Sequence, residues 1–103
     1  MSVIVEFSMF PTDKGDSVSS YVARIVKMLQ ESGISYQLTP MGSIFEVNEM
    51  PDALAVIAKA YRQLELDCGR VFATAKFDIR KGKSNRMERK IKAVEEKIGK
   101  VNK

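Results

Sequence analysis

The sequence predicts a domain of the α+β class, with helices packed on a four-stranded antiparallel sheet. Four segments alternate apolar and polar residues with a period of two, and three others repeat apolar residues at helical spacing. The seven segments follow one another as β-α-β-β-α-β-α. With 103 residues, 45% of them hydrophobic, the chain suits one domain over residues 1–103 with a modest core, and we expect its last few residues to fray.

The first predicted strand covers residues 3–10 and stops at Pro11. The following helix is expected to have its cap at Asp16 or Ser17 and to end at Gly33. One face of this helix is apolar and consists of Val18, Val22, Ile25 and Leu29.

Two short strands follow, at residues 34–39 and 44–48, joined by a turn at residues 40–43. A second helix then begins near Pro51. Its predicted apolar stripe consists of Leu54, Ile57, Tyr61 and Leu64.

The last strand covers residues 70–80, and a third helix follows it. Asn85 and Glu88 have the spacing of a capping box at the start of that helix. Its apolar stripe consists of Met87, Ile91, Val94 and Ile98, and we expect this stripe to serve stability or assembly. The order of elements is that of the ferredoxin-like sandwich, in which two helices cover one face of the sheet.

The two faces of the sheet follow from the alternation. The more apolar residues should lie under the helices, and they are Val3, Val5, Phe7, Tyr36, Leu38, Phe45, Val47, Val71, Ala73, Ala75 and Phe77. The other face mixes large apolar residues such as Ile4, Ile44 and Phe72 with charged ones, so we expect another subunit to cover it. Alternation also places Glu46 on that face, beside Lys76 and Ser8, and a carboxylate on a covered face needs partners.

The residue types bound the chemistry. The chain has no His and a single Cys, which removes the commonest zinc sites and general bases, so we expect no metal site. Catalysis is not excluded by this composition, and an enzyme stays a further alternative. Cys68 cannot form an internal disulfide, which suits the cytoplasm, and we expect it to fill a turn. The sequence contains neither a secretory signal pattern nor an apolar run long enough for a membrane span.

The charge is concentrated at the C-terminal end. Residues 76–103 hold 11 Lys and Arg against 4 Asp and Glu, whereas residues 1–75 hold 6 against 9. A basic end raises the alternative of an RNA-binding module, since these modules share the predicted topology. The predicted strand at residues 44–48 lacks an aromatic-rich signature and carries an acidic residue, so nucleic acid is not the expected partner. A regulatory domain that senses a small molecule remains the other alternative.

One segment resembles a known family. Residues 40–46 read Pro-Met-Gly-Ser-Ile-Phe-Glu, which is similar to the P-M-G-T-x-x-E turn and strand of the thiamine-binding protein family. The chain departs from that pattern at Ser43, where Thr is usual, and at Val47, where Gly is common. The similarity extends over most of the chain and also includes Ser17, Ser19, Tyr21, Asp78 and Arg80.

The resemblance implies a non-catalytic protein without a cofactor that binds thiamine or its hydroxymethylpyrimidine half. It also implies a homotetramer, a dimer of dimers, and we expect the pocket at a subunit interface. An aminopyrimidine needs an acceptor, donors and a flat apolar wall. Glu46, with Glu6 second, is the expected acceptor, and the other expected site residues are Ser43, Ser8, Thr74, Lys76, Phe10 and Tyr36. Two structural alternatives stay open, a cross-strand ion pair between Glu46 and Lys76 and a turn role for Ser43.

Overall fold

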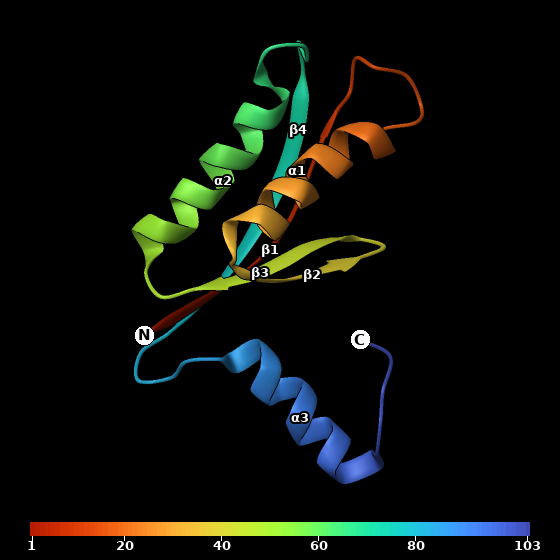
Figure 1. The fold of residues 1–103 in the computed structure, drawn as a ribbon. Coiled ribbons are helices and arrows are strands. Elements are labelled where there is room, and N and C mark those ends of the chain that lie inside the picture. The colour runs from red at the N-terminus through yellow and green to blue at the C-terminus, as the bar shows by residue number, and fades with distance from the viewer.

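The computed structural model describes residues 1–103 and confirms the predicted order of elements. The strands are β1 (Ser2–Pro11), β2 (Ser35–Thr39), β3 (Gly42–Val47) and β4 (Val71–Arg80), and the helices are α1 (Ser19–Ser32), α2 (Met50–Glu65) and α3 (Arg86–Ile98). The sheet is antiparallel with the strand order β2-β3-β1-β4. Figure 1 shows α1 and α2 together on one side of the sheet and α3 apart from them. The fold is therefore ferredoxin-like with an additional C-terminal helix.

The long strand β1 lies in the middle of the sheet. It pairs with β3 on one edge, from Val3 to Phe7, and with β4 along its whole length on the other. Its odd-numbered side chains point toward α1 and α2 and are buried, as the alternation predicts. Phe7 meets Phe45 of β3 edge to face, with the ring centroids 5.7 Å apart.

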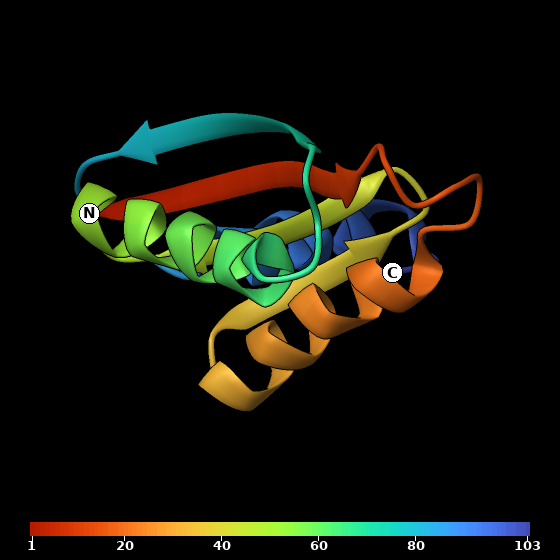
Figure 2. The ribbon, with the colours of Figure 1, turned by 90° about the horizontal axis from the view of Figure 1, so that it is seen from above.

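The core lies between the sheet and the pair α1 and α2, which Figure 2 shows side by side along one face. Thirteen buried residues form it: Val3, Val5, Phe7, Met9, Ile25, Met28, Leu29, Phe45, Ala53, Val56, Ala60, Leu64 and Cys68. Cys68 fills a turn after α2, as expected, and burial raises the pKa of its thiol.

The helix α2 buries a different face from the predicted one. Leu54 and Tyr61 are exposed, while Ala53, Val56 and Ala60 are buried with Leu64. Small side chains let α2 approach the sheet closely, so the helix is turned by about one residue relative to the prediction based on large apolar residues.

The helix ends also differ from the sequence prediction. The residue at the N-cap of α1 is Val18 and no side chain caps this end, so the predicted cap at Asp16 or Ser17 is wrong. The C-terminal end is as predicted, because Gly33 adopts the left-handed conformation that favours glycine. At α3 the predicted capping box is absent, since Asn85 makes no side-chain cap.

The edge strand β4 is more exposed than predicted. Ala73 and Ala75 are exposed, and Phe77 is 38% exposed, although the alternation placed all three under the helices. The helices lie over β1 and β3 and leave β4 uncovered at the edge. Leu38 on the opposite edge strand is also exposed, at 60%.

The helix α3 projects from the end of the sheet, which makes the molecule elongated, with extents of 45 × 29 × 22 Å. Only its first two residues, Arg86 and Met87, are buried, and Val94 and Ile98 on its apolar stripe are exposed. None of the three helices combines the length and apolar character that a membrane crossing requires.

Candidate functional site

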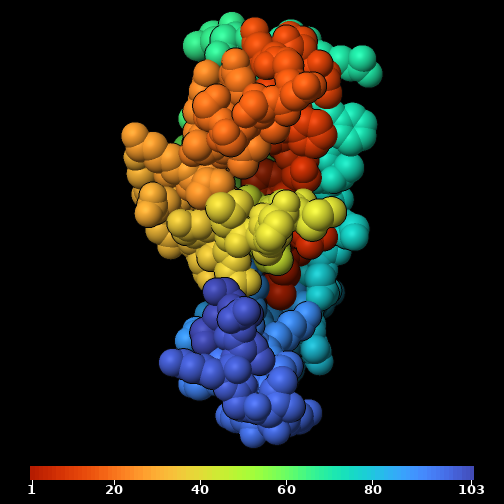
Figure 3. Space-filling model, turned by 90° about the vertical axis from the view of Figure 1, so that its right-hand side faces the viewer, coloured from red at the N-terminus to blue at the C-terminus, as the bar shows by residue number.

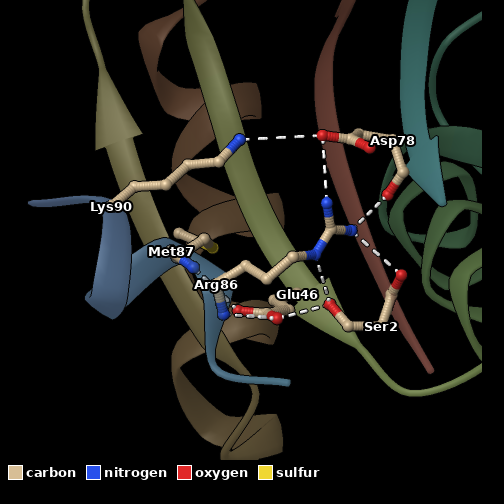
Figure 4. A network of polar contacts seen from close by, with 6 residues as sticks. All are labelled: Ser2, Glu46, Asp78, Arg86, Met87 and Lys90. Atoms are coloured by element: carbon tan, nitrogen blue, oxygen red, sulfur yellow. Dashed lines mark hydrogen bonds and ion pairs between the residues drawn. The ribbon is translucent and has the colours of Figure 1, made fainter. Parts of the chain in front are cut away.

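Glu46 lies on β3, on the face of the sheet opposite to α1 and α2, and it binds the start of α3. The backbone N–H of Arg86 donates to Glu46 Oε2 at 2.9 Å, and that of Met87 donates to Oε1 at 3.1 Å. The hydroxyl of Ser2 donates to Oε2 as well. Figure 4 shows these groups converging on the carboxylate. Glu46 therefore caps α3, so it stabilises this helix end through both hydrogen bonds and the helix dipole.

The side chain of Arg86 fixes the same junction from the other side. Its guanidinium is 5% exposed and donates from Nε to Ser2 Oγ at 3.1 Å and from Nη2 to the Ser2 carbonyl oxygen at 2.9 Å. Nη2 also donates to the carbonyl oxygen of Asp78, and Nη1 lies 3.0 Å from the Asp78 carboxylate. Lys90 is 3.6 Å from the same carboxylate (Figure 4). The buried charge is thus fully paired, as a stable fold requires.

This arrangement sets the ionisation of the two carboxylates. Burial alone would raise the pKa of Glu46, but the hydrogen bonds from Ser2 and from the N–H groups of Arg86 and Met87 outweigh burial and lower it. The pKa of Asp78 is also lowered, mainly by its hydrogen bond with Arg86. Both groups are therefore held in the charged form at neutral pH.

The predicted neighbours of Glu46 lie elsewhere on the open face. Lys76 forms an ion pair with Glu6, 3.7 Å away, so the alternative of a Glu46–Lys76 pair is wrong. Ser8 pairs across the sheet with Thr74, whereas Glu46 lies opposite Ile4. The strand register separates them, because Glu46 and Ser8 lie at different levels of the sheet. Both oxygens of Glu46 are also occupied by the protein itself.

The turn between β2 and β3 borders a separate pocket, named here the turn pocket. Its volume is about 200 Å³ and its walls are mostly apolar. In the space-filling view, β1 (red) is visible between α1 (orange) and this turn (yellow) (Figure 3). The lining consists of Phe7, Ser8, Met9, Phe10, Val18, Val22, Ile25, Leu38, Thr39, Pro40, Met41, Gly42 and Ser43. The turn pocket thus combines three predicted site residues, Ser8, Phe10 and Ser43, with the turn that carries the family resemblance.

The polar groups of the turn pocket are few and well placed. Ser43 is only 5% exposed as a whole residue, but its hydroxyl, which makes no hydrogen bond within the chain, keeps access to solvent. The carbonyl of Phe7 faces Gly42, so by strand alternation the N–H and C=O of Met9 point toward the same edge of β1. The pairing of β1 with β3 ends at Phe7, which leaves no strand partner for Met9 on that edge.

The turn itself is held in shape by Thr39 and Gly42. The Thr39 hydroxyl donates to the Gly42 carbonyl oxygen at 2.8 Å and accepts from the N–H of Met41 at 3.2 Å. A Cβ on Gly42 would lie 2.7 Å from the Phe7 carbonyl oxygen, closer than a real contact allows. Only glycine therefore lets the turn approach β1 so closely.

Tyr36 belongs to neither the turn pocket nor the open face. It lies across from Phe45, packs against the core and borders a groove of about 370 Å³ between β2 and α3. Sequence reasoning missed Arg86 as a buried clamp and did not identify Val18 and Val22 as pocket walls. The sequence did contain a sign of these two walls. The predicted apolar stripe of the first helix starts at Val18, one residue before α1 begins. No group of three or more potential metal ligands exists in the structure.

Comparison with known proteins is consistent with the sequence resemblance. A family model described as thiamine-binding protein matches residues 5–95. The UPF0045 protein MJ1052 of Methanocaldococcus jannaschii is 33% identical over 94 residues, which are 91% of this chain and 93% of that protein. A UPF0045 protein of Staphylococcus xylosus is 40% identical over 100 residues, covering 89% of this chain and 91% of the relative.

Solved structures show the same fold. The crystal structure of MJ1052 superposes with a TM-score of 0.79, 33% identity, and coverage of 92% of this chain and 97% of that one. A Thermotoga maritima protein, assigned provisionally to thiamine biosynthesis or salvage, superposes with a TM-score of 0.71. It is 18% identical, and the match covers 95% of this chain and 96% of that one. The second likeness concerns the fold alone. The match over residues 5–95 shows that the chain belongs to the thiamine-binding protein family.

Proposed function

We propose that this protein binds thiamine, or its hydroxymethylpyrimidine half, in the turn pocket and without catalysis. The observation that carries the proposal is the Ser43 hydroxyl, which lines the turn pocket, has no hydrogen-bond partner in the chain and can still be reached by solvent. A ligand in the turn pocket would shield this hydroxyl from water, so a hydrogen bond to the ligand would replace the one that water provides. The family to which the chain belongs supports the choice of ligand.

The turn pocket suits one flat polar ring. Its volume of about 200 Å³ is below that of a pocket for a drug-sized molecule, so a single ring fits better than the whole vitamin. An aminopyrimidine carries an amino donor beside a ring-nitrogen acceptor. The C=O and N–H of Met9 offer the complementary pair, Ser43 supplies a further donor or acceptor, and Phe10 and Leu38 provide apolar walls.

In this proposal a second copy of the chain completes the site. Met41 and Leu38 at the rim of the turn pocket are 86% and 60% exposed. Phe72, 5.9 Å from Phe10 between ring centroids, is 53% exposed on the open face. Burying these residues in a subunit contact would remove apolar surface from water and would close the pocket around the ring. The predicted homotetramer is the assembly we propose.

Titration calorimetry with thiamine and with hydroxymethylpyrimidine tests the proposed site. Ser43→Ala should weaken binding by about threefold to tenfold, which is the usual contribution of one neutral hydrogen bond. Ser84→Ala removes an exposed hydroxyl outside the turn pocket and is the matched control. An equal loss of affinity in both variants would show that the ligand does not bind at the turn pocket. Absence of binding by the unaltered protein would exclude the vitamin as the ligand.

A further inference from the structure

A second concave site lies at the other end of β1, where the β4–α3 loop meets the first two turns of α3. Its volume is about 220 Å³, and five of its six lining residues are cations. We name it the basic pocket, and it consists of Arg80, Lys83, Arg86, Arg89, Lys90 and Ala93. The even mix of charges over the rest of the chain makes this concentration unusual.

The basic pocket has few counter-charges. Asp78 is the carboxylate that pairs with its cations, and it serves both Arg86 and Lys90. Arg80, Lys83 and Arg89 form no ion pair within 4 Å. Like charges gathered in one concavity repel each other and focus a positive potential there. An anion in the pocket would relieve this repulsion.

One cation of the basic pocket, Arg86, is held in place and anchors the start of α3. The buried guanidinium of Arg86 is tied to Ser2 and Asp78, and the backbone of the same residue is tied to Glu46 (Figure 4). Arg89 and Lys90 follow three and four residues later, so they lie on the same side of α3. Because this part of the pocket is already ordered, less conformational entropy is lost when a ligand binds.

We propose that the basic pocket binds the phosphoryl group of a phosphate ester or diphosphate. Guanidinium groups donate paired hydrogen bonds that match phosphate oxygens, and lysine adds a point charge. The volume suits one or two phosphoryl groups rather than an extended polyanion. The pocket is separate from the turn pocket, because the two share no lining residue. Ser2, which holds Arg86, and Phe7, the first residue of the turn pocket, are five residues apart on β1, or roughly 17 Å. The proposal therefore does not depend on thiamine binding.

Calorimetry with inorganic pyrophosphate at constant ionic strength tests the proposal on the full chain. We expect saturable binding with one site per chain. Lys83→Gln/Arg89→Gln should weaken it by about tenfold or more, since two charged donors are removed. Lys14→Gln/Arg62→Gln removes the same two residue types from exposed positions on the loop after β1 and on α2, and should leave binding unchanged. Lys83→Gln alone, in the loop, provides a second variant that leaves α3 intact.

Three outcomes would overturn the proposal. The first is no saturable binding of pyrophosphate by the unaltered protein. The second is equal weakening in both double variants, which would show that net charge alone attracts the anion. The third is binding of polyuridine without binding of pyrophosphate, which would indicate a nucleic-acid backbone spread along α3 in place of a compact site.

Discussion

The Glu46 carboxylate lies 2.9 Å from the backbone nitrogen of Arg86, although 40 residues separate the two in the sequence. A strand residue thus caps α3, and the preceding residue Asn85 does not. The rest of α3 has few contacts with the sheet, because Arg86 and Met87 are its only buried residues. The position of the whole helix therefore depends on this junction.

Glu46→Gln should loosen α3. The substitution keeps the shape but removes the charge that binds two N–H groups and faces the helix dipole. We expect a loss of roughly 1.5–3 kcal/mol in the free energy that holds the junction. Hydrogen exchange should show faster exchange of the α3 amides, while the amides of β1 stay protected.

Glu6→Gln is the matched control for this substitution. Glu6 lies on the same open face and pairs with Lys76, which is 86% exposed, so its loss should change stability by less than about 1 kcal/mol. Equal exchange in both variants would show that the Glu46 cap does not hold α3.

Acid should release α3 before it unfolds the core. The pKa values of Glu46 and Asp78 are lowered in the folded protein, so the junction has its full stability above the ordinary carboxyl range and loses it as the pH falls through the folded values. Melting curves between pH 7 and pH 3 should fall less steeply for Glu46→Gln than for the unaltered protein. The pKa of Asp67, lowered to about 2 mainly by its hydrogen bond with Arg24, affects both proteins alike. Parallel curves would contradict the assignment.

Gly42→Ala should damage the turn pocket. The added Cβ would lie 2.7 Å from the Phe7 carbonyl oxygen, so the turn must move away from β1. We expect a loss of about 1–3 kcal/mol in urea unfolding and weaker binding of hydroxymethylpyrimidine. Gly82→Ala is the control, because Gly82 has a φ of +75° in open space and its substitution costs only backbone strain, about 1 kcal/mol. If Gly42→Ala left the binding of hydroxymethylpyrimidine unchanged, the turn would not be part of the ligand site.

The exposed apolar stripe of α3 should lie in a subunit contact. Val94 and Ile98 are 46% and 73% exposed. Val94→Glu should shift the protein toward smaller species in sedimentation velocity, because it places a charge in an apolar contact. Lys92→Gln changes the net charge by the same amount on the opposite side of α3, two residues away, and should not shift it. A monomer in the unaltered protein at micromolar concentration would exclude the predicted assembly.

The alternation of residues predicted the faces of β1 but not those of β4. Val3, Val5 and Phe7 are buried because β1 is central and lies under both helices. The inward positions of Ala75 and Phe77 follow the same pattern, yet β4 is an uncovered edge strand. Strand order and helix placement decide burial on β4, and the alternation of apolar and polar residues along a strand predicts neither of them.

The site was only partly predictable for a similar reason. The resemblance at residues 40–43 indicated the turn, and two of the expected site residues, Ser43 and Phe10, line the turn pocket. The partners of Glu46 are set by the contact between β3 and α3. The local pattern of Asn85 and Glu88 favoured self-capping of α3, and a long-range contact replaced it.

The bond between Arg86 and the carbonyl oxygen of Ser2 joins residues 84 positions apart, and this separation has a consequence for folding. The strand β1 is synthesised first, yet its two edges are completed only when β3 and β4 arrive. The binding surface for Arg86 exists only after both pairings fix Ser2, Glu46 and Asp78 together. Contacts of such separation form late, because closing a long loop costs entropy before the contact stabilises the chain. We therefore expect α3 to dock last, on a core that is already complete.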